Sequence, residues 1–351
     1  MVLPAQEPAA EITNLQIVHP AERIRVADPT SDTFLSVAKA YRDGEVDRPD
    51  VFVCELPGGY FHVRSGMTCT RDSRVLVDQG LEHRRFHYPH YGGLRPLRTQ
   101  HVQGACASII PCFHGNFWHW MIDGLPRVEL LARVMKGAPL TIVAPNSLNE
   151  YQRITLESVT PPNFKIEYLD PETWVSADRL LWASMVSQLE MGYLPRQYFD
   201  TIRHGIFKRF GLPEEHIKTE RIYISRAGAQ HRKILNEEAF CAFIEPYGFK
   251  RVLLEKLSFR EQVELFHKAE YVIGPHGAGL GTMLFSSDAP VVALYSNREP
   301  PGYFHSMACG LDQPHHFVCH DGEGEDDSFE ADLPAVKRVL EDELGLVART
   351  N

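Results

Sequence analysis

Short apolar segments alternate with helix-length amphipathic stretches along the chain, most clearly between residues 220 and 295. The segments of strand length are 221–225, 249–254, 270–274 and 290–295. The helix-length stretches between them are 236–247, 258–268 and 278–285. Asn236 is expected to cap the first of these helices, and Ser258 with Glu261 forms a capping box at the start of the second. Strands and helices that alternate at this spacing predict right-handed βαβ crossovers and a parallel sheet.

A second alternation of strands and helices precedes this region. The expected strands are 140–144, 164–169 and 179–183, and the expected helices are 148–159 and 195–210. A further helical pattern starts near Asn116, and from Leu125 to Met135 its apolar residues recur at the spacing of one buried face. Pro126 interrupts that pattern, so it is expected to kink the helix or to start a new one.

Residues 1–100 give fewer structural signals. Apolar segments at 51–56 and 60–63 flank Gly58-Gly59, a pattern that predicts a β-hairpin. The first 20 residues, rich in Pro, Ala and Glu, are expected to be extended or frayed. Residues 83–98 combine His, Tyr, Pro and Gly, and we expect irregular structure there.

These elements predict an α/β fold of two domains with a cleft between them. Residues 1–212 form the expected N-terminal domain and 213–325 the expected C-terminal domain. Residues 326–351 include a final amphipathic helix at 333–344, which is expected to pack back on the domains. The acidic stretch 321–327 is expected to be a solvated loop. Ligands of such folds bind outside the carboxyl ends of the strands.

Composition narrows the classes of partner and compartment. The chain has 351 residues, of which 44% are hydrophobic and 23% charged, so it can bury a substantial core. Its formal net charge of -10 gives no support for a nucleic-acid partner. The N-terminus lacks the pattern of a signal peptide, and no apolar run is long enough for a membrane span. Seven cysteines without a C-x-x-C pair predict reduced thiols and a cytoplasmic protein, with peripheral association with the inner membrane left open.

A glycine-rich turn, GPHGAGLG at 274–281, follows an expected strand directly and opens an expected helix. Glycine lets a ligand approach the main chain, and a helix start offers N–H groups that suit a diphosphate. His276, Gly277, Ala278 and Gly279 are therefore candidate phosphate ligands, although a turn that only permits close packing has the same pattern. A nicotinamide site is expected after the first strand of its domain, with an acid about 20 residues further on. Here the turn follows the third strand and the next strand ends without an acid, which argues against nicotinamide.

A cationic cluster follows the first strand of the same domain. Arg226, Arg232 and Lys233 lie in the loop after that strand, and Asn236 ends the loop. Guanidinium forks bind phosphate oxygens in pairs. Because neighbouring parallel strands end at the same edge of a sheet, this loop is expected near His276. A solvated basic loop without a ligand is the alternative interpretation.

A His and Asp pair marks the N-terminal half. His119 and Asp123 are four residues apart and would share one face of a helix. A carboxylate beside an imidazole orients it and raises its basicity, so either residue is a candidate catalytic base. His114, Asn116 and Trp118 precede the pair and are candidate acceptor-side residues. Two polar residues that simply bond each other explain the same pattern. No third metal ligand can be placed beside the pair, so no metal site is predicted.

These segments resemble glycosyltransferase family 61. The similar pieces, in family order, are FWHWMIDGLPRVELL at 117–131, RIYISR at 221–226, RKILNEE at 232–238, LSFREQVELFHKAEYVIGPHGAGLGTMLF at 257–285 and PVVALY at 290–295. The resemblance covers about half of the chain and does not extend to the first hundred residues.

The resemblance implies a GT-B fold of two Rossmann-like domains whose parallel sheets face an interdomain cleft. It implies an inverting hexosyl- or pentosyltransferase that requires no cofactor and moves a sugar from a nucleotide-sugar donor to a hydroxyl of a carbohydrate acceptor. Surface polysaccharide such as capsule, or another glycoconjugate, is the implied product. By this resemblance Arg226, Arg232 and the 274–281 turn bind the donor, and His119 and Asp123 face the acceptor. A sugar-nucleotide epimerase of GT-B architecture and a non-catalytic nucleotide-binding protein are the alternatives, and the oligomeric state is not predicted.

Overall fold

The chain divides into two compact units. The computed structural model describes residues 12–25, 45–76, 99–111, 113–187, 192–296, 302–320, 322–323 and 326–349. The first unit comprises the described residues of Met1–Arg23 and Asp47–Arg209, and the second those of Ile24–Val46 and Phe210–Asn351. The change of unit thus falls between Arg209 and Phe210, where the sequence predicts it after 212, and the described part of 326–351 belongs to the second unit. The loop predicted at 83–98 lies outside the described residues.

A mixed sheet forms the centre of the first unit. Within the described residues it has eight strands, and its main path runs in the order β1-β4-β10-β7-β8-β9. The strands are β1 (Thr13–His19), β4 (Val51–Glu55), β5 (Tyr60–His62), β6 (Thr68–Cys69), β7 (Gln100–Ser108), β8 (Leu140–Pro145), β9 (Phe164–Leu169) and β10 (Trp174–Ala183). Strands β10, β7, β8 and β9 are parallel to one another, whereas β4 pairs antiparallel with both β1 and β10. The expectation of a parallel sheet is therefore only partly right for this unit.

One prediction for the start of the chain is wrong. Strands β4 and β5 do not form the predicted hairpin in the described structure, because both pair antiparallel with β10. Strand β10 is longer than predicted and offers an edge to both, while Gly58, with a φ of 69°, bends the chain between them. The segment 13–19, expected to be extended or frayed, is extended: it forms strand β1 and pairs with β4.

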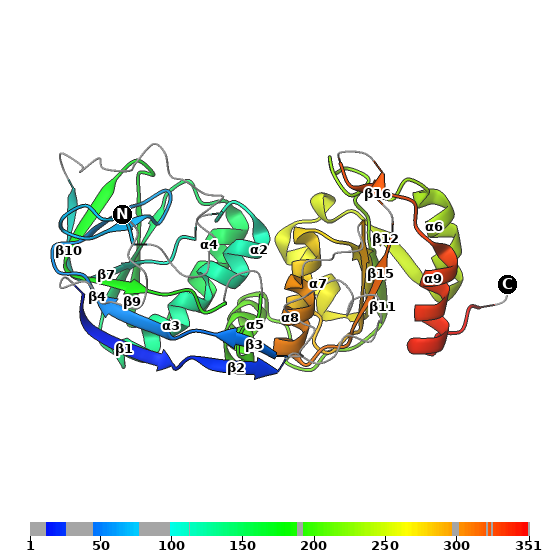
Figure 1. Cartoon of the computed structure of the whole chain (residues 1–351), viewed down its shortest axis with the longest axis horizontal. Coiled ribbons are helices and arrows are strands. Elements are labelled where there is room, and N and C mark those ends of the chain that lie inside the picture. Colours follow the sequence, from blue (N-terminus) through cyan, green and yellow to red (C-terminus); the bar gives the residue numbers. More distant parts are fainter. Residues whose placement is uncertain are drawn as a thin grey trace. The chain divides into compact units, whose positions relative to one another are not determined.

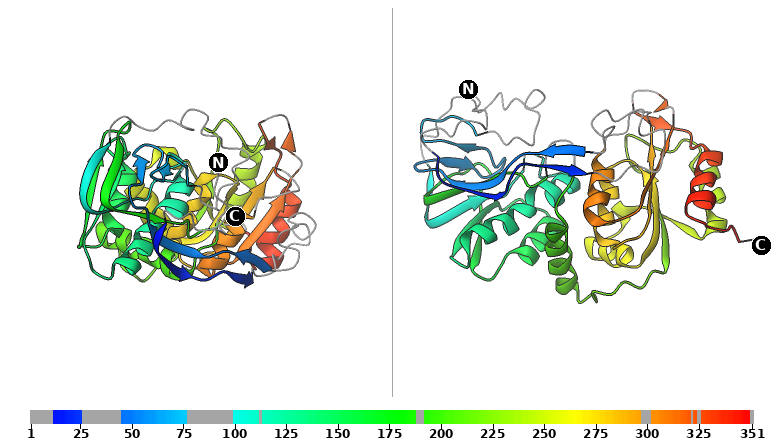
Figure 2. Two further views of the ribbon diagram at one scale, coloured as in Figure 1. Left: turned by 60° about the vertical axis from the view of Figure 1, so that its left-hand side comes forward. Right: turned by 60° about the horizontal axis from the view of Figure 1, so that its bottom comes forward.

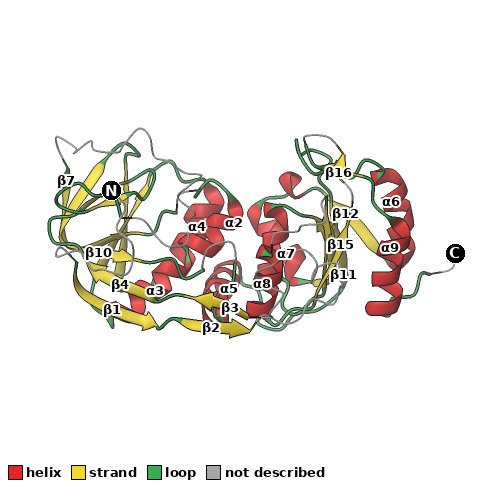
Figure 3. Cartoon of the chain, in the orientation of Figure 1, coloured by secondary structure: helices red, strands yellow, loops and turns green. Residues whose placement is uncertain are grey.

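A broken helix follows β7. The pieces are α2 (Phe117–His119), the π-helical turn η2 (Trp120–Gly124) and α3 (Pro126–Met135). Pro126 starts the new helix α3, where its missing N–H costs nothing, and Leu125 N–H bonds Trp120 O at 3.0 Å across the wider turn. The remaining helices of this unit are α4 (Glu150–Val159) and α5 (Arg196–Phe210). Figure 3 shows α2 to α5 together to one side of the strands.

The second unit contains an entirely parallel sheet. Its strands are β11 (Glu220–Ile224), β12 (Phe249–Val252), β13 (Ala269–Pro275), β14 (Val291–Tyr295) and β15 (His315–Cys319). All neighbours are parallel, and the order is β12-β11-β13-β14-β15. This is the 2-1-3-4-5 order of doubly wound nucleotide-binding folds, so the Rossmann-like expectation is right for this unit.

Helices cover both faces of the parallel sheet. The helical elements are α6 (Glu237–Ile244), η3 (Glu245–Tyr247), η4 (Leu254–Lys256), α7 (Phe259–His267), η5 (Ala278–Phe285), α8 (Tyr303–Leu311), α9 (Leu333–Arg338) and η6 (Val339–Glu343). Helices α6 and α9 lie on one face, and α7 and α8 on the other (Figure 1). The capping box of Ser258 and Glu261 is present at the start of α7. The C-terminal helix packs through Val336 and Leu340 into the same buried cluster as Phe240 of α6.

The second unit departs from the sequence prediction in three places. The helix expected at 278–285 is a 3-10 helix, since Gly279 and Gly281 support an α-helix poorly. The acidic stretch 321–327, expected to be a loop, contains strand β16 (Gly322–Glu323), which pairs with β17 (Ser328–Phe329) in a short ribbon. Helix α8 and strand β15 have no counterpart in the prediction.

Two further short strands, β2 (Glu22–Arg25) and β3 (Glu45–Arg48), form a separate ribbon, drawn in two shades of blue in both views of Figure 2. Along the described part of the chain, every helix is too short or too polar to cross a lipid bilayer.

Candidate functional site

The switch point of the second sheet lies between β11 and β13. In a 2-1-3-4-5 sheet the connections from the first and third strands leave to opposite faces, and ligands bind outside the carboxyl ends of these strands. Ser225 and Arg226 follow β11, and His276 and Gly277 follow β13. The two strands approach closely here, because a Cβ on Gly274 would lie 2.9 Å from the Cβ of Ile224. The predicted neighbourhood of the Arg226 loop and the glycine-rich turn is therefore confirmed.

Arg226 lies directly against the glycine-rich turn. Its Nε and Nη2 donate to the carbonyl of His231 at 3.2 and 3.0 Å, which folds the side chain over its own loop. A Cβ on Gly277 would contact Nη1 and lie 3.0 Å from Cζ of Arg226. Burial and then the charge of Arg232 lower the pKa of Arg226, whereas Glu255 raises it. The guanidinium is thus a partly buried cation beside a second cation, a setting that an anion would stabilise.

The far end of the same loop is tied to the C-terminal segment. Arg232 has a φ of 59°, and its N–H donates to Asp326 O at 2.8 Å. The N–H of Lys233 donates to Oγ of Ser328 at 3.1 Å, and Ile234 forms a parallel bridge with Phe329. These bonds use the backbone of Arg232 and Lys233 and not their side chains. Burial lowers the pKa of Arg232, whereas Asp327 raises it.

Asn236 does not cap α6 with its side chain as expected. Its Nδ2 donates to Ala331 O at 3.1 Å and its Oδ1 accepts Ala331 N–H at 2.8 Å. A backbone partner with both a donor and an acceptor satisfies an amide better than one helix N–H does. The amide therefore fastens the start of α6 to the C-terminal segment, and a contact of Asn236 with a donor stays a prediction.

His276 is enclosed by aromatic rings. Its ring centroid lies 5.1 Å from that of Tyr295, 6.4 Å from Tyr303 and 5.2 Å from Phe304. Burial, then the charges of Arg232 and Arg226, lower the pKa of His276 to about 3. The imidazole is therefore neutral at physiological pH. Its Nδ1 is buried and has no hydrogen-bond partner among the described residues, so a ligand that bonds it would satisfy an otherwise lost interaction.

The glycine-rich turn opens η5. Gly277 precedes the helix with a φ of 167°, Ala278 is its first residue, and Leu280 N–H bonds Gly277 O at 2.9 Å. The first N–H groups of a helix have no partner within it. A Cβ on Gly279 would lie 3.0 Å from Cδ1 of Leu254, so this glycine also serves close packing.

A pocket of about 410 Å³ lies beside the Arg226 loop. It is formed by the end of that loop and the first turn of α6: Ala227, Lys233, Ile234, Leu235, Asn236, Glu237, Glu238 and Ala239. The neighbours of Arg226 and Arg232 thus line a hollow large enough for part of a ligand.

The second candidate group lies in the first unit, with His119 at the end of α2 and Asp123 on η2. Nδ1 of His119 is 2.6 Å from Oδ2 of Asp123, and Oδ1 of Asp123 accepts the hydroxyl proton of Ser187 at 2.5 Å. The Asp123 side chain is 9% exposed and that of His119 30% exposed. The predicted pairing of His119 and Asp123 is confirmed. Ser187, which follows β10, carried no sequence signal for a place beside Asp123.

The three residues predicted on the acceptor side surround the start of α2. Asn116 caps this helix, with Oδ1 accepting Trp118 N–H at 2.9 Å. The carbonyl of His114 accepts Nε2 of Gln152 at 2.6 Å, and burial lowers the pKa of its ring. Asn116 is exposed, whereas His114 and Trp118 are half-buried. Their contact with an acceptor stays a prediction.

Side chains that could hold a metal ion do not gather in threes anywhere in the described ranges. This finding covers the described residues alone, so independence of the enzyme from a metal ion stays a prediction.

Comparison with known proteins identifies the family. The model of the family Glycosyltransferase 61 matches residues 117–293, about half of the chain. The matched range contains the His119 pair, the Arg226 loop and the glycine-rich turn. The EGF domain-specific O-linked N-acetylglucosamine transferase of Drosophila melanogaster is 31% identical over 112 residues, which cover 31% of this chain. The match spans 21% of that relative's length. The chain belongs to the glycosyltransferase 61 family.

Proposed function

We propose that this glycosyltransferase moves a sugar from a nucleotide-sugar donor to a hydroxyl of a carbohydrate acceptor, with inversion and without a metal ion or other cofactor. The observation that carries the proposal is the pair of Arg226 and Arg232 at the switch point of the second sheet, beside the glycine-rich turn, with Lys233 next to them in the same loop. In a chain of net charge -10, partly buried cations at the carboxyl ends of parallel strands support an anionic ligand there.

The donor diphosphate is the proposed anion. The two guanidinium groups, the Lys233 ammonium and the N–H groups that open η5 supply positive charge where the leaving phosphate gains negative charge. Burial and then the charge of Arg232 lower the pKa of Arg226, and a bound anion would relieve the repulsion from Arg232. His276 contributes a hydrogen bond and no charge, because its pKa near 3 keeps the ring neutral.

His119 is the proposed catalytic base. Because Nδ1 bonds Asp123, Nε2 is the ring nitrogen that would accept a proton. Asp123 is engaged by His119 and Ser187, so it orients the ring and stabilises the imidazolium. In the proposed step the acceptor oxygen bonds the anomeric carbon while the bond to the donor phosphate breaks on the opposite face. The hydroxyl proton passes to His119, and the nucleoside diphosphate leaves with the bonding electrons.

The proposal assigns the acceptor to the first unit and the donor to the second, the division of labour of a GT-B enzyme. The two α/β units support it, the second with a doubly wound parallel sheet. We further assign the reaction to the cytoplasm, at or near the inner membrane, in the synthesis of surface polysaccharide or a glycoconjugate. The free thiols of all six cysteines that the structure describes support a reducing compartment.

A thermal-shift screen of nucleoside diphosphates and nucleotide sugars, with and without EDTA, tests the donor. The Drosophila relative is named for N-acetylglucosamine, so nucleotide-linked N-acetylglucosamine is the first donor to try. A ligand at 100 times its Kd should stabilise the native state by about 2.7 kcal/mol, with or without EDTA.

Product analysis with a panel of saccharide acceptors tests the reaction. NMR of the product should show the anomeric configuration opposite to that of the donor. Failure of every nucleotide ligand to stabilise the protein contradicts the proposal, and so does conversion of the donor to an epimer without an acceptor. Activity that disappears with EDTA contradicts independence from metal.

A further inference from the structure

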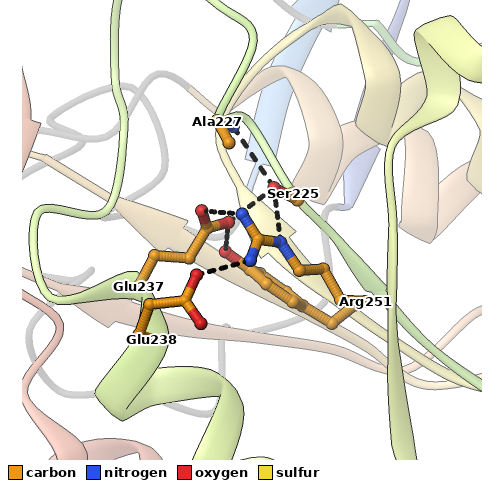
Figure 4. A network of polar contacts seen from close by, with 6 residues as sticks. Ser225, Ala227, Glu237, Glu238 and Arg251 are labelled. Carbon is orange, nitrogen blue, oxygen red and sulfur yellow. Dashed lines mark hydrogen bonds and ion pairs between the residues drawn. The ribbon is translucent and has the colours of Figure 1, made fainter.

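The loop after β11 begins at a polar network, shown in Figure 4. Its centre is Glu237, the first residue of α6, with a side chain that is 12% exposed. Oε1 of Glu237 accepts the hydroxyl protons of Tyr223 at 2.7 Å and Ser225 at 2.5 Å. Oε2 accepts Nη2 of Arg251, on β12, at 2.6 Å. With three charge-assisted bonds, this carboxylate is committed to the protein and is not a ligand-binding group.

Ser225 connects the network to the backbone of the loop. Its hydroxyl donates its one proton to Glu237, so its lone pairs remain as acceptors. They accept the N–H of Ala227 at 3.2 Å and Nε of Arg251 at 3.4 Å. Arg226 stands between Ser225 and Ala227, so this contact restrains the backbone on both sides of Arg226.

The side chain of Arg226 depends on that restraint. Within the described ranges its guanidinium hydrogen-bonds only the carbonyl of His231, in its own loop, and it lies against Gly277. If the backbone at Arg226 rotates, the fork turns away from the glycine-rich turn. Paired hydrogen bonds from a guanidinium to phosphate require a fixed orientation, so a shift of about 1 Å is enough to lose them.

We propose that Ser225, held by Glu237 and Arg251, is a positioning residue that aims Arg226 at the donor diphosphate. The identity of the anion rests on the proposed function. The role of Ser225 in holding the loop rests on the contacts above alone.

Ser225→Ala and Tyr223→Phe form a matched pair of variants. Each removes one buried hydroxyl that bonds the same oxygen of Glu237, and the two residues are 3% and 0% exposed. Only Ser225 also bonds the loop, at Ala227. Inorganic pyrophosphate is the probe, because it presents a diphosphate group without base or sugar. By calorimetry, Ser225→Ala should weaken pyrophosphate binding roughly tenfold, and Tyr223→Phe less than about twofold.

The Arg226→Gln background distinguishes positioning from general loosening. There, Ser225→Ala should cost no further affinity, because the group that it positions is gone. With a nucleotide sugar, Ser225→Ala should raise the KM for the donor and leave the KM for the acceptor unchanged.

Hydrogen exchange gives a second measurement that needs no ligand. Amides of 226–232 should exchange faster in Ser225→Ala than in Tyr223→Phe, while the sheet stays equally protected. The inference is overturned by equal affinity losses in the two variants, by equal exchange, by a loss that persists with Arg226→Gln, or by a wild-type protein that does not bind pyrophosphate. If pyrophosphate binds but no nucleotide sugar does, the proposed function fails and the role of Ser225 stands.

Discussion

Gly277 is the position where one methyl group tests the proposed donor site most directly. The Cβ of an alanine there would contact Nη1 of Arg226 and lie 3.0 Å from its Cζ. The φ of Gly277 is 167°, an extended conformation that alanine adopts without strain. The clash therefore falls on the end of a flexible side chain. We expect the guanidinium to move away from the turn while the fold persists.

The magnitude follows from what the guanidinium loses. Its two bonds to the exposed residue His231, at 3.2 and 3.0 Å, can be replaced by water, so the free energy of unfolding should fall by less than about 1 kcal/mol. A charge-assisted bond to phosphate is worth about 1.5–3 kcal/mol. Affinity for a nucleoside diphosphate should therefore fall roughly 10- to 150-fold.

Calorimetry with the tightest nucleoside diphosphate, together with urea unfolding, measures both quantities. Gly274→Ala should have the opposite signature. Its Cβ would lie 2.9 Å from Cβ and 3.2 Å from O of Ile224 inside the sheet, so we expect a stability loss of about 1–3 kcal/mol. Wild-type affinity of Gly277→Ala would refute the placement of Arg226 against the turn. An equal loss when Arg226 is already Gln would refute it as well.

Two further predictions concern the catalytic pair and acid stability. Asp123→Asn should lower kcat by about 10²–10⁴-fold at unchanged donor affinity, because it removes the carboxylate that orients His119; full turnover in a steady-state assay would remove Asp123 from the mechanism. His315 is buried without hydrogen-bond partners for its ring among the described residues, and burial, followed by His305 and His316, lowers its pKa well below 6.5. Because His315 has the higher pKa in the unfolded chain, the unfolded chain is protonated there first as pH falls. The stability that is present above pH 6.5 is therefore lost as pH falls below 6.5. Measured by urea unfolding between pH 7 and 5, the free energy of unfolding of His315→Leu should decrease less steeply with falling pH, by up to about 1.4 kcal/mol per pH unit. The same pH dependence in the variant and the wild type would contradict this role of His315.

The hydrophobic pattern reveals the second sheet where its strands are continuous apolar runs. Val291–Tyr295 is buried at every position and was predictable for that reason. Helix α8 and strand β15 were not predicted, because histidines occupy buried positions in them. His305, His315 and His316 are 4%, 6% and 7% exposed. A pattern that counts histidine as polar breaks at these residues, and only the folded structure shows that they belong to the core.

The candidate site is predictable as far as topology determines it. Adjacent parallel strands end at one edge, so Arg226 and His276 follow from their places after β11 and β13. Partners at long range have no local signal. Ser187 reaches Asp123 from 64 residues away, and Asn236 bonds Ala331 across 95 residues. Asn236 does not cap α6 with its side chain, because that side chain bonds the distant backbone of Ala331 instead.

The ties between the Arg226 loop and the C-terminal segment have a consequence for synthesis on the ribosome. Arg232 and Asn236 are bonded to Asp326 and Ala331, which are translated much later. Domains generally fold as they emerge, N-terminal first, so the first unit can fold long before those partners exist. The proposed donor site would then be completed only as the last part of the described chain leaves the ribosome. A nascent chain would carry its candidate base early and still be unable to consume nucleotide sugar.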